Sequence, residues 1–521
     1  MKISRRNFCL LMAGVCCTGV LAACGSSSSS TALSSAASAS AAASGEVRDE
    51  LIFVNYRDIR DLNPHLYAGE MYAQSILYDT LVSITANGYE GCLAESWDIS
   101  EDGCTYTFHI RPNVLFSDGE KCDANAILAN FNAILENRER HTWLEMMNLL
   151  VGVSAPDENT FVIEMSEPYY PMLTELGCIR PFAMISPNCM INGSTKDGVN
   201  GHIGTGPYVL TEEATGETVL TARSGWWQGR SLPFQTIHLA SVGQADDLIS
   251  SFDAGDITLL DADLTGTNSL GYSGSYEAWD YSTTNLIYLG FNTQRGPFRS
   301  AQLRRALSRG IDRRSIAEIS FAHHAVPTAL PIHPDSPLYH QLLSDSADYS
   351  PDDLVKGLEG QQLGSDGLVF LVNSENSSKV AAAQRIVDQL SGAGVSISLE
   401  RLSWTEYLAA LERGDFDLYL AEVRLTADFD LTQLVGTRGG LNYGGWSDPA
   451  TDGLLSAFRA AGAELRSSAA ASLCSHLIQN APIVPICFKN GSVLTQWGRL
   501  SGLDPVRDNV FHGLENWVLD P

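Results

Sequence analysis

Two arginines and one aspartate stand out in this sequence as side chains that could bind a charged ligand. Arg180 lies in an apolar stretch at 178–182, and a charge in such a setting usually has a partner. Arg140 ends a charged run at 136–140, which on its own indicates a solvated surface charge. The planar guanidinium of arginine stays charged and can bind a carboxylate through two hydrogen bonds. Asp428 is either an exposed loop carboxylate or the partner of a cationic group.

Catalytic signatures are missing from the sequence. There is no HExxH, no GxxxxGK and no GxSxG. The glycines at 204 and 206 do not form a dinucleotide loop, because the third glycine position holds Val209. His323 and His324 are the only adjacent histidines, and we expect polar loop residues there, with metal ligation as the alternative. A dispersed Ser/His/Asp triad keeps an enzyme open as a second class.

Charge and length limit the possible partners and architecture. The 521 residues contain 33 Lys+Arg against 61 Asp+Glu, a formal net charge of -28, and 44% are hydrophobic. Such acidity argues against a nucleic-acid partner, since phosphate binding needs a basic surface. The length corresponds to about three compact units.

The N-terminus indicates export and lipid anchoring. Lys2, Arg5 and Arg6 precede an apolar run at 8–23, so residues 1–23 are interpreted as a signal peptide. The run ends in LAACG, which resembles a bacterial lipobox and predicts that Cys24 is lipidated. The paired arginines also resemble a twin-arginine signal. Residues 24–45, lipidated Cys24 and a Ser/Ala tether, cannot form a core.

Seven cysteines follow this segment. Their odd number and the absence of CxxC spacing argue against a disulfide framework or a zinc site. We expect most of them to be small buried apolar residues. A single Cys178/Cys189 or Cys92/Cys104 bridge is the alternative.

The hydrophobic pattern predicts an α/β protein. Residues 104–110 alternate apolar and polar side chains as a strand does. Asp123 is expected to cap a helix whose apolar positions from Ile127 to Leu135 follow helical spacing. Residues 368–372, 379–390 and 395–399 form a predicted strand–helix–strand unit, which is typical of a parallel sheet.

Several phrases in the chain resemble the family 5 extracellular solute-binding proteins of peptide and nickel ABC importers. The resemblance extends from about residue 51 to the C-terminus. The matching strings are LAESW (93–97), SEDG (100–103), YTFHIR (106–111), FSDG (116–119), GTGPY (204–208), LGFNT (289–293), LRRAL (303–307), IDR (311–313) and APIVP (481–485).

Three further strings resemble the nickel and metallophore binders within that family. They are LNPHLY (62–67), ENRERHTWLE (136–145) and YYP (169–171) leading to RPF (180–182). The resemblance implies that Arg140 and Arg180 hold carboxylates of an anionic chelate, with Trp143 and Tyr67 lining the same pocket. The resemblance therefore implies that Arg140 is a ligand contact, whereas its local sequence alone indicates a solvated surface charge.

The implied fold is a two-lobe clamshell of the periplasmic-binding-protein type (type II, large cluster C). Lobe I would contain residues 46–287, with an extra sub-domain at about 95–200, and the C-terminal return at 488–521. Lobe II would contain residues 288–487. Ligand would bind between the lobes and close them.

Lobe II departs from the nickel binders. Leu425 and Phe429 stand where the resemblance expects a tryptophan and a tyrosine, and Asp428 instead resembles an aspartate that pairs with a peptide amine. The stretch at 436–446 has no histidine to complete a metal site. We therefore expect the chelator to supply the metal ligands, with Arg438 and Asn442 as further binding residues and no metal ligand from the protein.

The resemblance thus implies a lipoprotein, not an enzyme, that captures a nickel or other transition-metal chelate. A peptide binder of the same fold is the alternative. No intrinsic cofactor is expected. The expected partners are an ABC permease and ATPase, reached at the outer face of the cytoplasmic membrane or in the periplasm, and a monomer is expected.

Overall fold

A computed structural model of the chain describes residues 50–519 except 56–61, 67–70, 86–87, 215–216, 243, 267–274, 362 and 364–366. The predicted signal peptide at 1–23, the segment 24–45 with Cys24, and Tyr67 lie outside the described residues. Within the described part of the chain, no helix combines the length and apolar character needed to cross a membrane.

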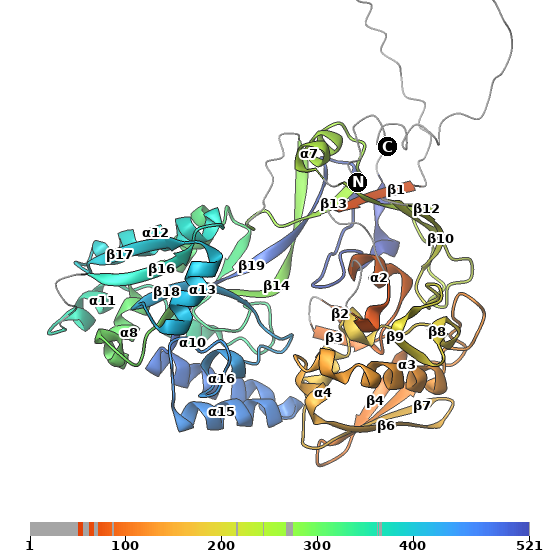
Figure 1. Cartoon of the computed structure of the whole chain (residues 1–521), viewed down its shortest axis with the longest axis horizontal. Helices are drawn as coiled ribbons and strands as arrows, with labels where there is room; N and C mark the ends of the chain where they lie inside the picture. Colours follow the sequence, from red (N-terminus) through yellow and green to blue (C-terminus); the bar gives the residue numbers. More distant parts are fainter. Residues whose placement is uncertain are drawn as a thin grey trace, which may run out of the picture.

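The molecule has two lobes joined by one continuous sheet (Figure 1). Eleven strands of the described chain belong to this sheet, and the last of them, β15, pairs with β19 at its side. In sheet order they are β10 (Tyr208–Ala214), β11 (Glu217–Ala222), β12 (Thr236–Ser241), β1 (Glu50–Asn55), β13 (Leu259–Ala262), β19 (Ile483–Gln496), β14 (Tyr276–Phe291), β18 (Leu418–Arg424), β16 (Leu368–Asn373), β17 (Ile397–Leu402) and β15 (Ala325–Pro327).

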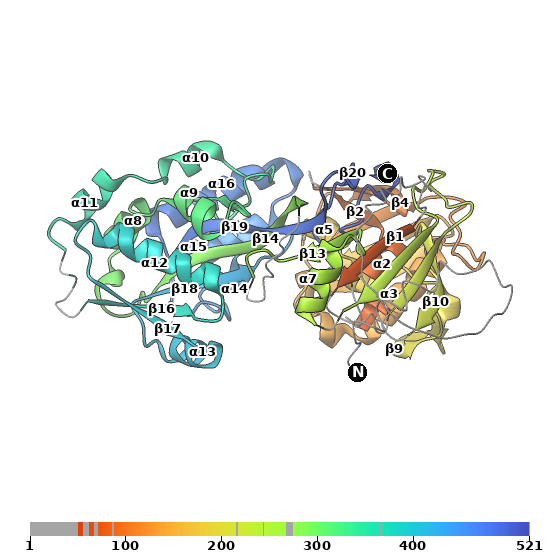
Figure 2. The ribbon, with the colours of Figure 1, turned by 90° about the horizontal axis from the view of Figure 1, so that it is seen from above.

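The long strands β14 and β19 connect the lobes (Figure 2). They pair antiparallel, but the register shifts between Ser282 and Leu286. At this interruption Thr283 donates to the Lys489 carbonyl, and Thr284 donates to the Leu425 carbonyl at 2.7 Å. Irregular pairing bends a strand locally, so we take this interruption as the candidate hinge between the lobes.

A buried lysine also links the lobes at the hinge. Lys489 on β19 is 3% exposed, and its Nζ lies 3.2 Å from an oxygen of Asp263 and 3.3 Å from one of Glu422. Asp263 follows β13 of lobe I, whereas Glu422 belongs to β18 of lobe II and also pairs with Lys379. Two carboxylates thus offset the cost of burying the ammonium group.

Lobe I contains a second, four-stranded sheet and most of the short elements. Its further elements are η1 (Pro64–Leu66), α2 (Met71–Leu77), β2 (Val82–Thr85), β3 (Gly88–Gly91), β4 (Ala94–Ile99), β5 (Thr105–Ile110), α3 (Ala124–Glu136), η2 (Arg138–His141), α4 (Glu145–Leu149), β6 (Leu150–Asp157), β7 (Thr160–Met165), α5 (Met172–Glu175), α6 (Ile179–Phe182), η3 (Pro187–Cys189), β8 (Met190–Ile191), β9 (Ser194–Val199), α7 (Ala245–Asp253), β20 (Leu500–Ser501), η6 (Leu514–Asn516) and β21 (Val518–Leu519). The four-stranded sheet has the order β4-β5-β7-β6.

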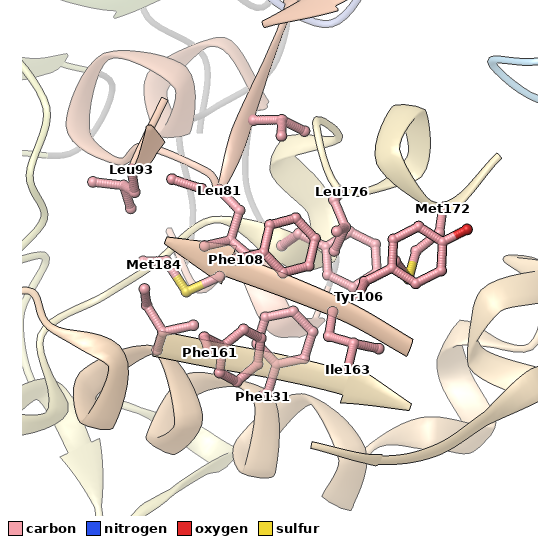
Figure 3. Packing of buried hydrophobic residues seen from close by; sticks show 14 of the residues in the cluster. Leu81, Leu93, Tyr106, Phe108, Phe131, Phe161, Ile163, Met172, Leu176 and Met184 are labelled. Atoms are coloured by element: carbon pink, nitrogen blue, oxygen red, sulfur yellow. The ribbon is translucent and has the colours of Figure 1, made fainter. Parts of the chain in front are cut away.

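The core of this sheet confirms the local predictions for lobe I (Figure 3). Strand β5 buries Tyr106 and Phe108 on one face, as its alternation predicted. Helix α3 begins at the predicted cap, because the Asp123 carboxylate accepts hydrogen bonds from two backbone amides of the first turn. Phe131 on this helix packs against Phe161, with ring centroids 4.8 Å apart. Complete burial of one such ring stabilises the fold by about 2 kcal/mol.

Lobe II is an α/β unit around β16, β17 and β18. Its helices are η4 (Pro297–Arg299), α8 (Ala301–Arg309), α9 (Arg313–Ser315), η5 (Ile316–Ser320), α10 (Gln341–Ser346), α11 (Pro351–Leu358), α12 (Ser377–Ser391), α13 (Trp404–Arg413), α14 (Thr432–Val435), α15 (Pro449–Ala460) and α16 (Ala463–Asn480). Strands β16 and β17 are parallel and α12 connects them, which confirms the predicted strand–helix–strand unit.

Candidate ligand-binding cleft

Arg180 lies at the edge of the lobe I core, next to α2. Helix α6 carries Arg180 and Phe182, and the Phe182 ring stacks on Phe131 of α3 with centroids 6.0 Å apart. The guanidinium is half-buried, and its Nε donates to Oε1 of Gln74 at 2.7 Å. The expectation that a charge in this apolar stretch has a partner is therefore confirmed.

Arg140 and Trp143 lie on the segment between α3 and α4. Both are exposed, and the Trp143 side chain keeps 54% of its surface accessible. The same segment leads to Glu145, whose Oε1 lies 3.3 Å from Nη1 of Arg459 on lobe II. Residues 140–145 therefore lie on the rim of lobe I that faces α15.

A cavity of about 240 Å³, here called the cleft cavity, lies between the lobes beside β14. Helix α2, strands β13 and β14, the end of β18 and the C-terminal segment contribute its walls. It is lined by Met71, Tyr72, Asp261, Tyr281, Thr283, Asn285, Arg424, Arg507, Asp508 and Val510.

Two guanidiniums at the cleft cavity converge on one carboxylate. Asp508 accepts a hydrogen bond from Nη2 of Arg424, and its other oxygen lies 3.4 Å from Nε of Arg507. Burial raises the pKa of Cys178 to about 12, and Arg507 and Arg424 act in the opposite direction. Both arginines therefore lie close to the segment that carries Arg180.

A second cavity of about 470 Å³, here called the hinge cavity, shares Tyr281, Thr283 and Arg507 with the cleft cavity. Its walls also come from both lobes and the hinge. The remaining lining residues are Ile84, Thr85, Gly88, Thr174, Asp280, Ser282, Thr284, His333, Asp335, Ser336, Pro337, Ala427, Phe429, Asp504, Pro505 and Val506. The two cavities together form the candidate binding cleft.

Phe429 lines the hinge cavity and Leu425 lies behind it in the loop after β18. Both are buried, and Phe429 contacts Phe488 with ring centroids 5.8 Å apart. Thr284 fixes the loop, because its hydroxyl donates to the Leu425 carbonyl and its carbonyl accepts from the Leu425 amide at 3.0 Å.

Asp428 points away from both cavities. Its Oδ2 accepts from Nη2 of Arg466 on α16 at 2.7 Å, and the carboxylate is almost fully buried. Burial raises the pKa of Asp428, while Arg466 acts in the opposite direction. The alternative of an exposed loop carboxylate is wrong for this residue, because α16 covers it.

Glu175 of lobe I lies within electrostatic reach of Asp428. Burial raises the pKa of Glu175 to about 8, the hydrogen bond from Tyr169 lowers it, and the charge of Asp428 raises it. The Tyr169 hydroxyl donates to Oε1 of Glu175 at 2.6 Å, and the Met146 amide donates to Oε2 at 3.3 Å. The contact between the lobes therefore holds several buried acids.

Arg438 and Asn442 lie in the loop between α14 and α15, and neither lines the two cavities. Arg438 is exposed. The Asn442 amide donates to the carbonyls of Gly436 and Trp446 at 3.0 and 2.7 Å, and its oxygen accepts from the Trp446 amide at 2.9 Å. Asn442 thus braces its own loop.

His323 and His324 form a turn beside the hinge. Nδ1 of His324 lies 2.9 Å from Oδ2 of Asp280. Across the described ranges of the chain, no group of three or more His, Cys, Asp or Glu side chains is arranged to hold a metal ion. All seven described cysteines are free, and five of them are buried, so both alternative disulfides are wrong.

A larger depression of about 880 Å³ lies entirely in lobe I and its C-terminal segment. Trp227 stacks under Arg111 there, and its indole donates to the buried Asp79 at 3.0 Å. Because no lobe II residue lines this depression, it is separate from the candidate binding cleft.

Comparison with known sequence families decides what this two-lobe molecule is. The model for bacterial extracellular solute-binding proteins, family 5, matches residues 88–437. The chain belongs to this family.

The similar family 5 proteins have names that refer to different ligands. The chain is 34% identical to the nickel-binding periplasmic protein of Escherichia coli (strain K12) over 268 residues, which cover 50% of this chain and 51% of that protein. It thus spans about half the length of that relative. It is 24% identical over 449 residues to the periplasmic murein peptide-binding protein MppA of the same strain, covering 78% and 81%.

A solved structure supports the family 5 fold. NikA from Brucella suis in complex with Fe(III)-EDTA superposes with a TM-score of 0.74 at 23% identity, and the match covers 90% of this chain and 100% of that one. The predicted two-lobe α/β fold is therefore confirmed.

Four charged residues of this family 5 protein are not predicted as site residues by its sequence: Arg424, Arg507, Asp508 and Arg466. Arg424 ends β18, whereas Arg507 and Asp508 lie in the C-terminal segment. Arg424 and Asp508 are 84 positions apart in the sequence. No local signal singles out Arg507 and Asp508, because the return at 488–521 contains other charged residues on both sides of them.

Proposed function

We propose that this family 5 protein is the substrate-binding component of an ABC importer and captures a carboxylate-bearing chelate of nickel or another transition metal. The chelate would bind between the lobes, and the closed protein would deliver it to a permease and ATPase. Under this proposal the protein is a monomeric lipoprotein anchored through Cys24 at the outer face of the cytoplasmic membrane, or periplasmic, and it catalyses no reaction.

The observation that carries the proposal is the placement of positive charge. In a chain of formal net charge -28, Arg424 and Arg507 line the cleft cavity, and Arg180 lies two residues from Cys178, whose pKa both of them influence. Arginine clusters suit planar carboxylates because each guanidinium offers two parallel donors. An acidic ligand could therefore bind the two arginines of the cleft cavity, in competition with Asp261 and Asp508, which line the same cavity.

Under this proposal the arginines of the cleft bind the chelator, and the chelator supplies the ligands of the metal. The protein would hold carboxylates through Arg180, Arg424 and Arg507, with Arg140 and Trp143 reaching the ligand from the rim of lobe I. Tyr67, Phe429, Arg438 and Asn442 remain predicted contacts. Metal binding by the protein itself would require deprotonated N, O or S donors fixed in the cleft.

A peptide ligand is the second candidate. It is favoured by the similarity to MppA and by the Ala427–Phe429 stretch, in which Asp428 was predicted to pair with a peptide amine. The ion pair between Asp428 and Arg466 weakens this candidate, because an incoming amine would have to displace a guanidinium that is itself largely buried.

Mass spectrometry of co-purified small molecules, together with metal analysis of the same sample, tests the proposal directly. Calorimetry with Fe(III)-EDTA, with nickel(II) and L-histidine, with free Ni²⁺ and with a tripeptide then compares ligand classes. We expect binding of at least one chelate and none of free Ni²⁺. Tight binding of free Ni²⁺ would contradict the proposal and direct mutagenesis to His323 and His324.

Variants locate the site. Arg180→Ala and Arg424→Ala should each weaken chelate binding by about 1.5 to 3 kcal/mol, the range for hydrogen bonds to charged groups. Arg413→Ala is the matched control, because Arg413 is an exposed lobe II arginine at the end of α13 that pairs with Asp415. Unchanged affinity in folded Arg180 and Arg424 variants would refute the site, and tight tripeptide binding would favour the second candidate.

A further inference from the structure

The carboxylate of Asp508 occupies the position between two arginines of the cleft cavity. One oxygen accepts from Nη2 of Arg424 and the other lies 3.4 Å from Nε of Arg507. The Asp508 side chain is 10% exposed. All three residues line the same cavity.

The Arg424–Asp508 pair spans the two lobes. Arg424 is the last residue of β18 in lobe II. Asp508 belongs to the C-terminal segment, which is anchored on lobe I because the Phe511 ring packs against Phe53 of β1 at 5.1 Å. In the described chain, the Asp508 carboxylate therefore connects the two lobes at the cleft cavity. A ligand bound in this cavity would have to connect the lobes at the same place.

The geometry of this pair imitates a bound ligand. A carboxylate that accepts a hydrogen bond from one guanidinium and forms an ion pair with a second, one from each lobe, is an arrangement expected for an acidic ligand in a closing cleft. Asp508 also has a left-handed backbone, φ 69°, which aspartate tolerates better than most residues but which still costs free energy. This φ belongs to the tight turn that two backbone hydrogen bonds between Val506 and Asn509 close, so the turn fixes the position from which the Asp508 side chain extends.

We propose that Asp508 is an internal substitute for a ligand carboxylate and that the ligand must replace it on Arg424 and Arg507 to bind. This inference rests on the proposed function, and it adds a reason why the cleft would select some ligands over others. A ligand with two or more carboxylates can compensate for the displaced Asp508 at both guanidiniums, whereas a neutral ligand cannot. Asp508 thus sets both the affinity and the charge preference of the cleft.

The test is calorimetry of Asp508→Asn with Fe(III)-EDTA at low ionic strength. Asparagine keeps the shape but removes the charge that competes for the arginines, so we expect binding about 5- to 20-fold tighter than in the wild type, the scale of one charge-assisted hydrogen bond. Asp508→Ser should act in the same direction if Asp508→Asn folds poorly. Glu515→Gln is the matched control: it removes one charge from the same C-terminal segment, but Glu515 pairs with Arg230 and lines neither the cleft cavity nor the hinge cavity.

Each outcome is decisive. Tighter binding in Asp508→Asn and unchanged binding in Glu515→Gln would support the role of Asp508 as an internal substitute for a ligand carboxylate. Equal or weaker binding in both Asp508 variants, with the wild type binding Fe(III)-EDTA, would overturn this inference and leave the proposed function intact. If neither wild type nor variants bind any of the chelates, the proposed function fails and this inference fails with it.

A measurement without ligand gives an independent answer. Solution scattering of ligand-free Asp508→Asn should show a larger radius of gyration than the wild type, since one connection between the lobes has lost its charge. An unchanged radius, with the double variant Arg424→Gln/Asp508→Asn also unchanged, would contradict the role of this pair in holding the lobes together.

Discussion

Arg459 of lobe II and Glu145 of lobe I form an ion pair on the side of the molecule opposite the hinge strands. Nη1 and Oε1 are 3.3 Å apart, and both side chains are half-buried, at 24% and 34% exposure. Figure 1 shows α15, which carries Arg459, next to α4, which begins with Glu145. With the strands β14 and β19 at the other side, this pair encloses the candidate binding cleft.

The first prediction concerns this ion pair as a latch. Arg459→Ala and Glu145→Ala should each weaken the closed form by about 0.5 to 1 kcal/mol, the upper part of the range for partly exposed pairs. Scattering should therefore show a larger radius of gyration for each variant. The charge exchange Glu145→Arg with Arg459→Glu should restore the wild-type value. A double-mutant cycle without coupling would exclude the latch.

The second prediction concerns the buried Glu175. Its pKa is raised by burial from 4.5 to about 8, so between these values the folded protein holds a proton that the unfolded chain has lost. Stability therefore falls as pH rises from about 4.5 to 8. Glu175→Gln, which is always neutral, should be more stable than the wild type at pH 9 by on the order of 2 kcal/mol.

Thermal unfolding of both proteins between pH 5 and pH 9 measures this effect. The gain from Glu175→Gln should shrink toward pH 5, where the folded wild-type carboxyl is protonated and the pH lies only slightly above the unfolded pKa of 4.5. The exposed pair partner Glu158 on the opposite edge of lobe I provides the control variant Glu158→Gln. A gain that does not grow with pH would contradict the assignment.

The third prediction concerns acid sensitivity near Arg180. His65 is fully buried between Thr195 and the Ala183 carbonyl, and burial lowers its pKa from 6.5 to about 4. The unfolded chain therefore binds the proton first as pH falls, so stability that is present above pH 6.5 is lost toward pH 4. The loss should be on the order of 2 kcal/mol.

Denaturant unfolding at pH 7 and pH 4.5 measures the free energy of unfolding. Between these pH values it should fall less in His65→Gln than in the wild type, although the variant is less stable at pH 7. His109→Gln, at an exposed histidine of β5, is the matched control and should keep the wild-type slope. Equal slopes in all three proteins would show that another group carries the acid sensitivity.

The fourth prediction separates two roles for Asn442. Its three hydrogen bonds within the loop between α14 and α15 imply that Asn442→Ala lowers stability by about 1 to 3 kcal/mol. Arg438→Ala in the same loop should leave stability within about 0.5 kcal/mol, as exposed substitutions usually do. If Asn442→Ala instead keeps full stability and loses chelate affinity, the predicted role as a ligand contact is the correct one.

The fifth prediction concerns the N-terminus. Cys24→Ala should yield protein that carries no lipid and is released from the membrane, since one acylated cysteine is the only membrane contact that the sequence indicates. Labelling with radioactive palmitate followed by fractionation measures this. Label that persists on the Cys24→Ala variant would place the lipid elsewhere.

The sequence alone predicted the elements whose determinants are local. The alternation in β5, the Asp123 cap of α3 and the β16–α12–β17 unit all depend on residues a few positions apart, so side-chain periodicity and backbone capping are sufficient to specify them. The need for a partner at Arg180 also followed from its apolar neighbours. The family strings extended these local features to the two-lobe fold.

Only the tertiary structure decided which charges meet. Whether Arg424 finds Asp508, or Asp428 finds Arg466, depends on how the loop after β18, the C-terminal segment and α16 approach one another at the hinge. Spacing along the chain contains no such information, because electrostatic pairing acts through distances in space, and these are set here by the packing of two lobes. For this reason Asp428 appeared in the sequence as a ligand contact, whereas in the folded protein its charge is engaged by Arg466.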